Sequence, residues 1–439
     1  MTTGEKGRAM PSRDREASLG IEVTTQCNSR CLHCFARAGR PGRETLPPAT
    51  VEDVLSEGRE AGYRHLHVTG GEPLLWPALF ETLDAARAMG YRTAYLNTNG
   101  TLLTRETAER LAGCEGLRLS VSLEGPEALH DRFRGAGAHR RAVSGIENAL
   151  REGLDVVVFT LAGKGLLPEL PRFADDLFDR FPGIRYLTLI QLINVEGEGF
   201  PLSDELLEPE EFLVLVQTAS LLNLYGLPTH VKNSTLATAV SNLMGMPWIP
   251  GVHPLHREGN LIVRANGLIG LSHSGGGTFG RYEPGAIRRV LSSDAYRRAV
   301  HPDETVCPSC GHVDVCRSYG MLRPTDRNMA PFRDEPFCKS VMDAASLRQE
   351  PQQTFNVQKQ EKEKTHEKSQ ATQNEEGLCR FHGGCRGRQG SGHGVPPLLG
   401  PERSPGVLRQ QGVQRHHGRD REDPQAQDEA GVENEPPVH

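Results

Sequence analysis

Between about Ser18 and Thr229, short apolar runs alternate with longer segments in which apolar residues recur near helical spacing. Runs rich in β-branched and aromatic residues indicate strands, and amphipathic segments that end at Gly indicate helices. The predicted strands are LGIEVTT, RHLHVTG, RTAYLNT, LRLSVSL, DVVVFTL and RYLTLIQL. The predicted helices are VEDVLSEGREAG, LFETLDAARAMG, TRETAERLAG, AVSGIENALREG, ELPRFADDLFDRF and EPEEFLVLVQTASLLNLYG. Six such units predict an α/β fold, a partial (β/α)6 TIM-type barrel that is open at one side.

The pattern changes at both ends of this region. Residues 1–17 are polar and charged and are predicted to be disordered, and the barrel is assigned to 18–230. A small appended domain is assigned to 231–346, with the hairpin-like LIVRANGLIGL and its Asn-Gly turn, a Gly-rich loop SHSGGGTFG, a helix around LSSDAYRRAV, and then four cysteines. Residues 347–439 have too few apolar residues to form a core, so a disordered low-complexity tail is predicted. A frame change or read-through could also have produced that tail.

Composition excludes little but directs attention to the cysteines. The chain has 439 residues, 37% of them hydrophobic, and a formal net charge of −6. This charge gives no general reason to expect nucleic acid or a membrane surface as a partner. The N-terminal segment lacks the apolar region of a secretory signal and no later run is long enough to span a bilayer, so a cytoplasmic protein is predicted. In a reducing compartment, clustered cysteines are more often metal ligands or redox groups than disulfides.

Three cysteines, Cys27, Cys31 and Cys34, lie directly after the first predicted strand. Their spacing, C-x3-C-x2-C, supplies three thiolates from one loop. A 4Fe-4S cluster has four iron corners, so three cysteines would leave one iron open to another ligand. The loop would lie at the carboxyl end of the strand, where barrel enzymes assemble their sites. A zinc site completed by His33 and a redox C-x2-C pair are the alternatives.

A second motif, VTGGEPLLW, follows the second predicted strand. Together, C-x3-C-x2-C-F after the first strand and GGEP after the second resemble the signature of the radical S-adenosylmethionine (radical SAM) superfamily. The resemblance implies that the open iron binds the amino and carboxylate groups of S-adenosylmethionine. It also implies that one electron from the cluster cleaves this cofactor to methionine and a 5′-deoxyadenosyl radical, which abstracts a substrate hydrogen. No side chain is assigned as catalytic, because the cofactors carry the chemistry.

The resemblance assigns the GGEP residues to the binding of S-adenosylmethionine. Gly70 and Gly71 would allow close backbone approach, and Pro73 would stiffen the loop. Glu72 and nearby carbonyl groups would accept hydrogen bonds from the methionine ammonium. On its own, GGEP could also be a plain turn.

Four further residues are assigned to the same cofactor. They are Asn97 in LNTNG, Ser122 and Glu124 in SVSLEG, which resembles the family's S-x-D-G, and Arg134 in HDRFRG, which resembles H-D-x-x-R-G. Ser122 and Glu124 alternate onto one side of their strand. The Arg134 guanidinium could hold the methionine carboxylate through two hydrogen bonds. The alternatives are a strand-end cap for Asn97 and a solvated surface loop for Arg134.

Four more cysteines, Cys307, Cys310, Cys316 and Cys338, have the spacing C-x2-C-x5-C with a late fourth member. This spacing resembles the SPASM/twitch extension of radical SAM enzymes, which implies an auxiliary 4Fe-4S cluster; a zinc ribbon is the alternative. The full SPASM pattern has seven cysteines, and the positions expected for the others are occupied by Ser272, His273, Ser274 and Gly320. One auxiliary cluster is therefore predicted instead of two. Of the remaining cysteines, Cys114 is predicted to be a packed free thiol, and no role is given to Cys379 and Cys385.

Three functions follow from these motifs. The main prediction is a radical SAM maturase that modifies a peptide or protein. The second is a radical SAM enzyme of small-molecule or cofactor (porphyrin-type or sugar) biosynthesis, and the third is a non-catalytic zinc or Fe-S protein. Only 26 residues precede Cys27, too few for the peptide-recognition domain of many maturases, so a separate recognition protein or direct binding in the barrel is expected. The other expected partner is an electron donor of the flavodoxin or ferredoxin type.

Overall fold

The computed structural model describes residues 17–36, 38–39, 43–194, 199–232, 236–247, 249–250, 259–272, 275–300, 310–316 and 337–348. Within these ranges, the side chains of 272, 275–277 and 313–314 are not described. The predicted disorder of 1–17 and 347–439 falls outside the described residues, except for 17, 347 and 348.

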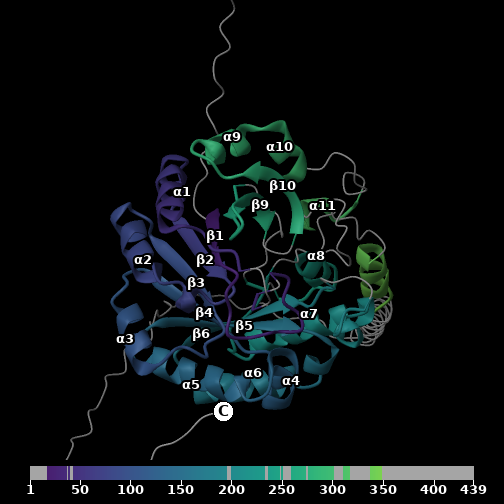
Figure 1. Cartoon of the computed structure of the whole chain (residues 1–439). Helices are drawn as coiled ribbons and strands as arrows, with labels where there is room; N and C mark the ends of the chain where they lie inside the picture. The colour runs from purple at the N-terminus through teal and green to yellow at the C-terminus, as the bar shows by residue number, and fades with distance from the viewer. Residues whose placement is uncertain are drawn as a thin grey trace, which may run out of the picture. The chain divides into compact units, whose positions relative to one another are not determined.

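The six predicted strands are all present, and each pairs in parallel with the next (Figure 1). The predicted α/β class with a parallel sheet is therefore confirmed. The strands are β1 (Ser18–Thr24), β2 (His65–Gly70), β3 (Thr93–Thr98), β4 (Leu117–Ser122), β5 (Asp155–Ala162) and β6 (Ile184–Gln191).

The six predicted helices are also present. Local signals fix several of their ends: the Thr104 hydroxyl accepts from the Thr107 N–H at the start of α3, and Glu208 and Glu211 form a capping box at the start of α7. The helices are α1 (Pro48–Glu60), α2 (Leu79–Ala88), α3 (Arg105–Ala112), α5 (Ala138–Arg151), α6 (Leu170–Arg180) and α7 (Pro209–Leu224).

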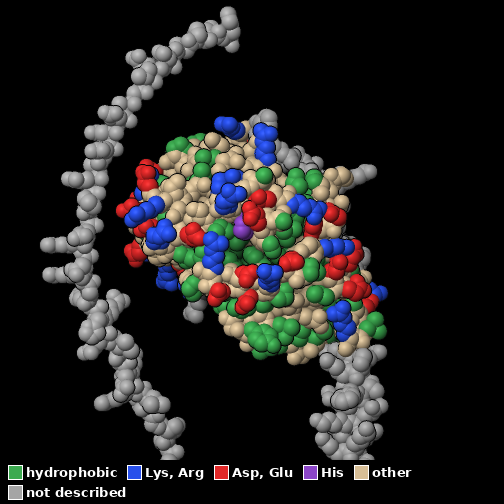
Figure 2. Space-filling model, turned by 90° about the horizontal axis from the view of Figure 1, so that it is seen from below, with side chains coloured by type: hydrophobic (Ala, Val, Ile, Leu, Met, Phe, Trp, Pro, Cys, Tyr) green, Lys and Arg blue, Asp and Glu red, His purple; other side chains and the backbone are tan. Residues whose placement is uncertain are grey.

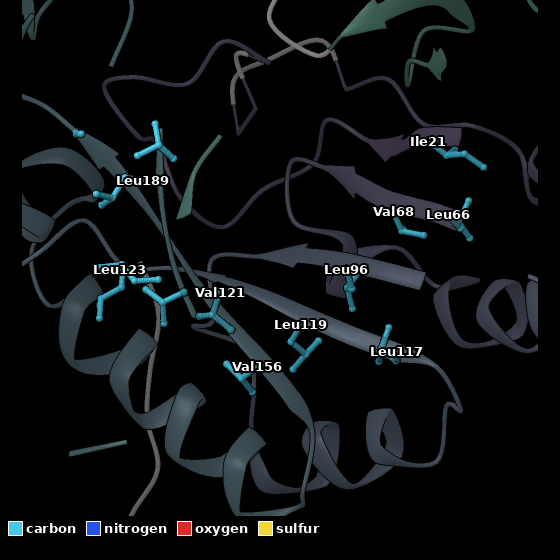
Figure 3. Packing of buried hydrophobic residues seen from close by; sticks show 14 of the residues in the cluster. Ile21, Leu66, Val68, Leu96, Leu117, Leu119, Val121, Leu123, Val156 and Leu189 are labelled. Atoms are coloured by element: carbon cyan, nitrogen blue, oxygen red, sulfur yellow. The ribbon is translucent and has the colours of Figure 1, made fainter. Parts of the chain in front are cut away.

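Alternation along the strands gives the sheet two different faces. One face carries the apolar residues of the main core, including those labelled in Figure 3, such as Ile21, Val68 and Leu119. Buried residues of the helices belong to the same core. Because neighbouring side chains of a strand point to opposite faces, the intervening residues lie on the other side of the sheet. This second side is called the polar face below; its residues include Tyr95, Asn97, Arg118, Ser120, Ser122, Tyr186 and Thr188.

Several elements were not predicted from the sequence. Helix α4 (Glu127–Arg134) lies between β4 and α5. It buries only His130 and Phe133, too few positions to give a clear helical period. The short strand β7 (Thr229–Val231) extends the parallel sheet beyond β6. Helix α8 (Leu236–Leu243) and the 3-10 turns η1 (Pro73–Leu75), η2 (Lys164–Leu166) and η3 (Ser203–Glu205) complete this part of the chain.

The region after β7 adds its strands to the other edge of the same sheet. Strand β8 (Leu261–Val263) pairs in parallel with β1, and β9 (Leu268–Ser272) pairs antiparallel with β8. Their connection is the predicted Asn-Gly turn, with Gly267 at a φ of 80°. The prediction of a Gly-rich loop is wrong from Gly275 onwards, because β10 (Gly275–Arg281) pairs with β9. The ten strands follow the order β10-β9-β8-β1-β2-β3-β4-β5-β6-β7.

The predicted division into a barrel and an appended domain stays a prediction. The boundary between 230 and 231 falls inside β7, and β8 shares the sheet of the barrel. The remaining helices are α9 (Ala286–Ser292), α10 (Asp294–Val300) and α11 (Val313–Cys316), and residues 337–348 are also helical.

The surface shows no strong segregation of charge on the side seen in Figure 2, where acidic and basic side chains are interspersed. Among the described residues, no helix is long and apolar enough to cross a membrane.

Candidate active site

The three-cysteine loop leaves the carboxyl end of β1 and is anchored on both sides. The Gly39 N–H donates to the Thr25 carbonyl (3.1 Å). This hydrogen bond joins the end of the loop to its start. The Leu32 N–H donates to the Phe133 carbonyl in α4 (3.0 Å). Cys27, Cys31 and Cys34 are all half-buried free thiols. Backbone hydrogen bonds within the loop and to α4 therefore fix the position of the predicted cluster loop.

Each of the three sulfurs accepts a hydrogen bond from the protein. Such N–H donors stabilise negative charge on cluster-bound thiolates and help to set a cluster's reduction potential. The donors are the Ser29 N–H (3.4 Å) and Asn99 Nδ2 (3.9 Å) on Cys27, Arg134 Nη1 on Cys31 (3.8 Å), and the Ala38 N–H on Cys34 (3.3 Å).

The electrostatics of the loop favour a positively charged occupant. The pKa of Cys27 is raised to about 11, mainly by burial. The Ser29 N–H opposes this shift, whereas the negative charges of Glu72, Cys31 and Cys34 add to it. Burial also raises the pKa of Cys31, against the opposing effect of Arg134. Coordination to a metal cation favours the thiolate, so the donor set fits an iron-sulfur cluster.

The alternative of a zinc site completed by His33 finds no support. His33 is buried, with Nε2 3.8 Å from Glu124 Oε1 and its ring 5.8 Å from Phe133. Within the described ranges, no group of three or more His, Cys, Asp or Glu side chains could hold a single metal ion. A cubane cluster differs in this respect, because each of its protein ligands binds a separate iron.

The glycines of GGEP bring the loop after β2 against the loop after β1. Gly70 has a φ of 144°, and a Cβ at Gly70 would overlap the Thr24 carbonyl. A Cβ at Gly71 would overlap the Gln26 carbonyl. The Gly71 N–H donates to Thr24 (2.6 Å) and the Glu72 N–H to Gln26 (2.8 Å). Only glycine allows this approach, so the motif holds the start of the cysteine loop in place and is more than a plain turn.

Glu72 joins the second and third strands through its side chain. It is fully buried; Oε1 accepts from Thr98 Oγ1 (2.8 Å) and the Leu74 N–H (3.2 Å), and Oε2 accepts from the Asn99 N–H (2.8 Å). Burial raises its pKa to about 6, although these hydrogen bonds lower it in part. Pro73 is buried and begins η1. The carboxylate thus has protein partners, and its predicted contact with S-adenosylmethionine stays a prediction.

The end of β3 contributes a residue that the sequence analysis passed over. Asn99 is buried and donates through Nδ2 to Asn28 Oδ1 (2.8 Å) as well as to Cys27. The predicted residue Asn97 is half-buried, in register with Ser120 of β4. The repeat N-T-N in LNTNG was the available signal, because residues two apart share one side of a strand.

Glu124 and Arg134 meet beside Cys31, as an ion pair in which Glu124 is 1% exposed and Arg134 12%. Glu124 Oε1 accepts from Arg134 Nε (2.7 Å), and Oε2 accepts from the Leu161 N–H (2.6 Å). Burial by itself lowers the pKa of Arg134, but the charges of Glu124 and Cys31 outweigh it and the net shift is upward. The alternative of a solvated surface arginine is therefore wrong, because α4 places Arg134 at the cysteine loop.

Other predicted residues are only partly described. Ser122 is half-buried at the end of β4. Cys310, Cys316 and Cys338 are half-buried: Cys310 and Cys316 lie at the start and end of residues 310–316, which include α11, and Cys338 lies in helical residues 337–348. Cys307 lies outside the described residues. Ser272 ends β9; its side chain, His273, Ser274 and Gly320 lie outside the described part of the chain. The four-cysteine auxiliary site therefore stays a prediction. Cys114 is half-buried against the core, as predicted, and Cys379 and Cys385 are not described.

The chain resembles known enzymes in both sequence and fold. The family model of the radical SAM superfamily matches residues 21–177. Mycofactocin maturase MftC from Mycobacterium ulcerans is 24% identical over an alignment of 363 residues, and the match covers 77% of this chain and 91% of that protein. An AdoMet-dependent heme synthase from Oleidesulfovibrio alaskensis is 34% identical over 153 residues, which are 34% of this chain and 39% of that protein.

A solved structure shares the fold at low sequence identity. The crystal structure of Streptococcus suis SuiB bound to precursor peptide SuiA has a TM-score of 0.55 and 16% identity, and the match covers 68% of this chain and 70% of that chain. The family match spans β1 to α6, and it therefore includes both the cysteine loop and the GGEP loop. These findings, together with the geometry of the cysteine loop, show that the chain is an enzyme of the radical SAM superfamily, whose cofactors are S-adenosylmethionine and a 4Fe-4S cluster.

Proposed function

We propose that this radical SAM enzyme is a maturase that modifies a peptide. The observation that carries the proposal is the extent of the match to mycofactocin maturase MftC, which covers 77% of this chain. The match to the heme synthase covers only 34%. The similarity to a maturase therefore extends well beyond the portion shared with the heme synthase. The fold of SuiB, which was solved with a precursor peptide bound, supports the same assignment.

Cys27, Cys31 and Cys34 would hold the radical SAM cluster in this enzyme. When bound, the cluster and S-adenosylmethionine supply a 5′-deoxyadenosyl radical that abstracts a hydrogen atom from the substrate. The protein's part is to hold, orient and shield these groups. Asn99 and Arg134 stabilise the charge of two of the ligand sulfurs, because their N–H groups point at Cys27 and Cys31.

The residues predicted to bind S-adenosylmethionine fall into two groups, those that hold the site together and those that would touch the cofactor. Glu72 and Glu124 belong to the first group, since each accepts hydrogen bonds from protein donors on both oxygens. The carbonyl groups of Gly70 and Gly71 are the proposed acceptors for an ammonium group, because those of Glu72 and Pro73 already accept from the Leu75 and Trp76 N–H groups. Arg134 uses Nε and one hydrogen on each Nη group, at Glu124 and Cys31, which leaves two of its five N–H donors for a carboxylate. Asn97 and Ser122 face the same side of the sheet and complete the proposed contact set.

The proposal includes an auxiliary cluster and external partners. Cys307, Cys310, Cys316 and Cys338 would bind one auxiliary 4Fe-4S cluster in a SPASM/twitch-like region. The radical SAM cluster needs an electron, so a flavodoxin- or ferredoxin-type donor is proposed. A separate peptide-recognition protein is a further proposed partner. We place the enzyme in the cytoplasm, because clustered free thiols persist in a reducing compartment.

The second candidate function is the modification of a porphyrin-type small molecule. It is favoured by the higher identity of the heme synthase, 34% against 24%. One experiment separates the two functions. The reconstituted enzyme is incubated with S-adenosylmethionine and dithionite, in one sample with short peptides encoded next to its gene and in a parallel sample with iron-coproporphyrin. A mass change in a peptide that depends on S-adenosylmethionine supports the maturase. A change confined to the porphyrin contradicts it.

A further inference from the structure

Lys232 carries a positive charge that has no carboxylate partner in the described part of the chain. It directly follows β7, and its backbone N–H donates to the Leu189 carbonyl of β6 (3.0 Å). Its side chain turns over the polar face, with Nζ 5.4 Å from the centroid of the Tyr186 ring. This cation-π contact stabilises the ammonium only modestly. A partly buried ammonium in this position therefore lacks a counter-ion.

Tyr186 and His230 form a flat aromatic platform beneath Lys232. Their rings are stacked, with centroids 3.9 Å apart and planes inclined by 11°. Tyr186 belongs to β6 and His230 to β7, which are paired in parallel. The platform is rigid because both residues lie on strands, and it restricts the directions in which the Lys232 side chain can extend.

Asp155, a carboxylate whose charge acts on Tyr186, is already engaged. Asp155 Oδ2 accepts from Arg118 Nε (2.8 Å) and Nη2 (2.7 Å), and from Arg185 Nη1 (2.9 Å). The pKa of Lys232 is lowered to about 8, mainly by burial and in smaller part by the charge of Arg118. Arg118 and Arg185 thus share the Asp155 carboxylate, and Lys232 has no ion-pair partner among the described residues, so this end of the sheet carries an excess of positive charge.

A buried hydroxyl on the same strand has no hydrogen-bond partner. Thr188 is fully buried, and its Oγ1 is unpaired within the described residues. Thr188 is in register with His230 and lies two positions after Tyr186, hence on the same face. A buried hydroxyl without a partner costs free energy. An acceptor held at this face would remove that cost.

We propose that Lys232 and Thr188, above the Tyr186–His230 platform, form a subsite for a carboxylate group of the substrate. One ammonium and one hydroxyl match the two oxygens of a carboxylate, whereas a phosphate dianion would keep an unpaired oxygen and charge. The subsite deepens the proposed function, because it names a group of the substrate that the enzyme would bind. It rests on that function only for the source of the group: on a peptide substrate, the carboxylate is either the C-terminus or an acidic side chain. Its role is to fix the substrate on the polar face, within the open side of the barrel.

The first test measures binding without turnover. The reconstituted full-length enzyme is treated anaerobically with a low dose of formaldehyde and cyanoborohydride, and dimethylation of each lysine is quantified by mass spectrometry. Acetate, at up to about 100 mM and constant ionic strength, is the probe, and acetamide is its uncharged control. Lys164, which is paired with Glu208 and Glu211, is the reference lysine in the same sample. We expect acetate to slow labelling of Lys232 several-fold relative to Lys164, and Thr188→Val to weaken this protection.

The second test identifies the source of the carboxylate. Steady-state kinetics compare the variants Lys232→Gln and Lys232→Arg and the control Lys164→Gln. The substrate is a peptide that the enzyme modifies, supplied in three forms: unaltered, amidated at the C-terminus, and with its acidic side chains replaced by their amides. We expect Lys232→Gln to raise KM by about 10- to 100-fold, Lys232→Arg to restore most of the loss, and Lys164→Gln to have no effect. The peptide form on which Lys232→Gln causes no further loss identifies the bound carboxylate.

The two tests separate the subsite from the proposed function. Protection of Lys232 by acetate no greater than that by acetamide overturns the subsite, even if peptides are modified. An equal effect of Lys232→Gln on all three peptide forms also overturns it. If acetate protects Lys232 but no peptide is modified, the peptide assignment fails and the carboxylate belongs to a small molecule.

Discussion

Glu124 and Arg134 form a buried ion pair that ends at the cysteine loop: Glu124 Oε1 lies 2.7 Å from Arg134 Nε, and Arg134 Nη1 lies 3.8 Å from Cys31 Sγ. The Glu124 N–H in turn donates to His130 Nδ1 (3.0 Å), which fastens α4 to the end of β4. The pair therefore links the cluster loop to two elements of the barrel.

Removing one partner of this pair leaves a buried charge uncompensated. We expect Arg134→Met to reduce the free energy of unfolding by about 3–5 kcal/mol. The double variant Glu124→Gln/Arg134→Met should lose less than the single variant, because no charge is stranded. Urea unfolding in a background with alanine at Cys27, Cys31 and Cys34 measures this without a contribution from cluster loss. If the double variant loses as much free energy of unfolding as Arg134→Met and Glu124→Gln lose together, the two side chains are not coupled.

Glu72 should make stability depend on pH in a direction opposite to that of a salt-bridged carboxylate. Its pKa is raised from 4.5 to about 6 in the folded protein, so the folded state binds the proton more tightly than the unfolded state does. The contribution of Glu72 to stability is therefore greatest below pH 4.5 and is lost as the pH rises through 6, by about 2 kcal/mol in total. In the same cysteine-free background, the difference in stability between the parent and Glu72→Gln should show this change. A difference that is constant from pH 4 to pH 7 would refute it.

Gly71 should be needed for the cluster loop to adopt its conformation. A methyl group at Gly71 would overlap the Gln26 carbonyl directly before Cys27, and backbone cannot move aside cheaply. We expect Gly71→Ala to lose more than half of the iron bound after reconstitution. Gly113→Ala is the matched control. Gly113 has a φ of −71°, which suits any residue, and a Cβ added there would lie 3.3 Å from its nearest neighbour, the Arg110 carbonyl oxygen. Equal iron in both variants would argue against this role of Gly71.

Asn99 should affect the potential of the cluster, and Asn97 should not. Asn99 Nδ2 donates to Cys27 Sγ, and such a bond favours the reduced, more negative cluster. Loss of a hydrogen bond of about 1 kcal/mol corresponds to ~40 mV for one electron. Asn99→Ala should therefore lower the reduction potential by roughly that amount, as measured by EPR-monitored titration. Asn97→Ala should leave the potential unchanged and weaken binding of S-adenosylmethionine; the opposite assignment of the two effects would refute the account.

The repeating strands and helices were predictable because their apolar periods are long and clear. The cluster cysteines and GGEP were predictable because each motif is contiguous. The contacts between motifs were not: Arg134 reaches Cys31 through the short helix α4, and Glu72 holds Asn99 across 27 residues of sequence. The pairing of β8 with β1 was also hidden, because Leu19 and Leu261 are neighbours only in the folded sheet. No local pattern in the sequence encodes such distant pairs.

The most direct test of the central claim is anaerobic cleavage of S-adenosylmethionine. The full-length protein is reconstituted with iron and sulfide, its iron is counted, and 5′-deoxyadenosine is measured after addition of dithionite and S-adenosylmethionine. The account predicts about eight irons per chain in two clusters, falling towards about four in Cys310→Ala, and formation of 5′-deoxyadenosine that disappears in Cys31→Ala. Zinc in place of iron, or a loaded cluster that forms no 5′-deoxyadenosine, would contradict it.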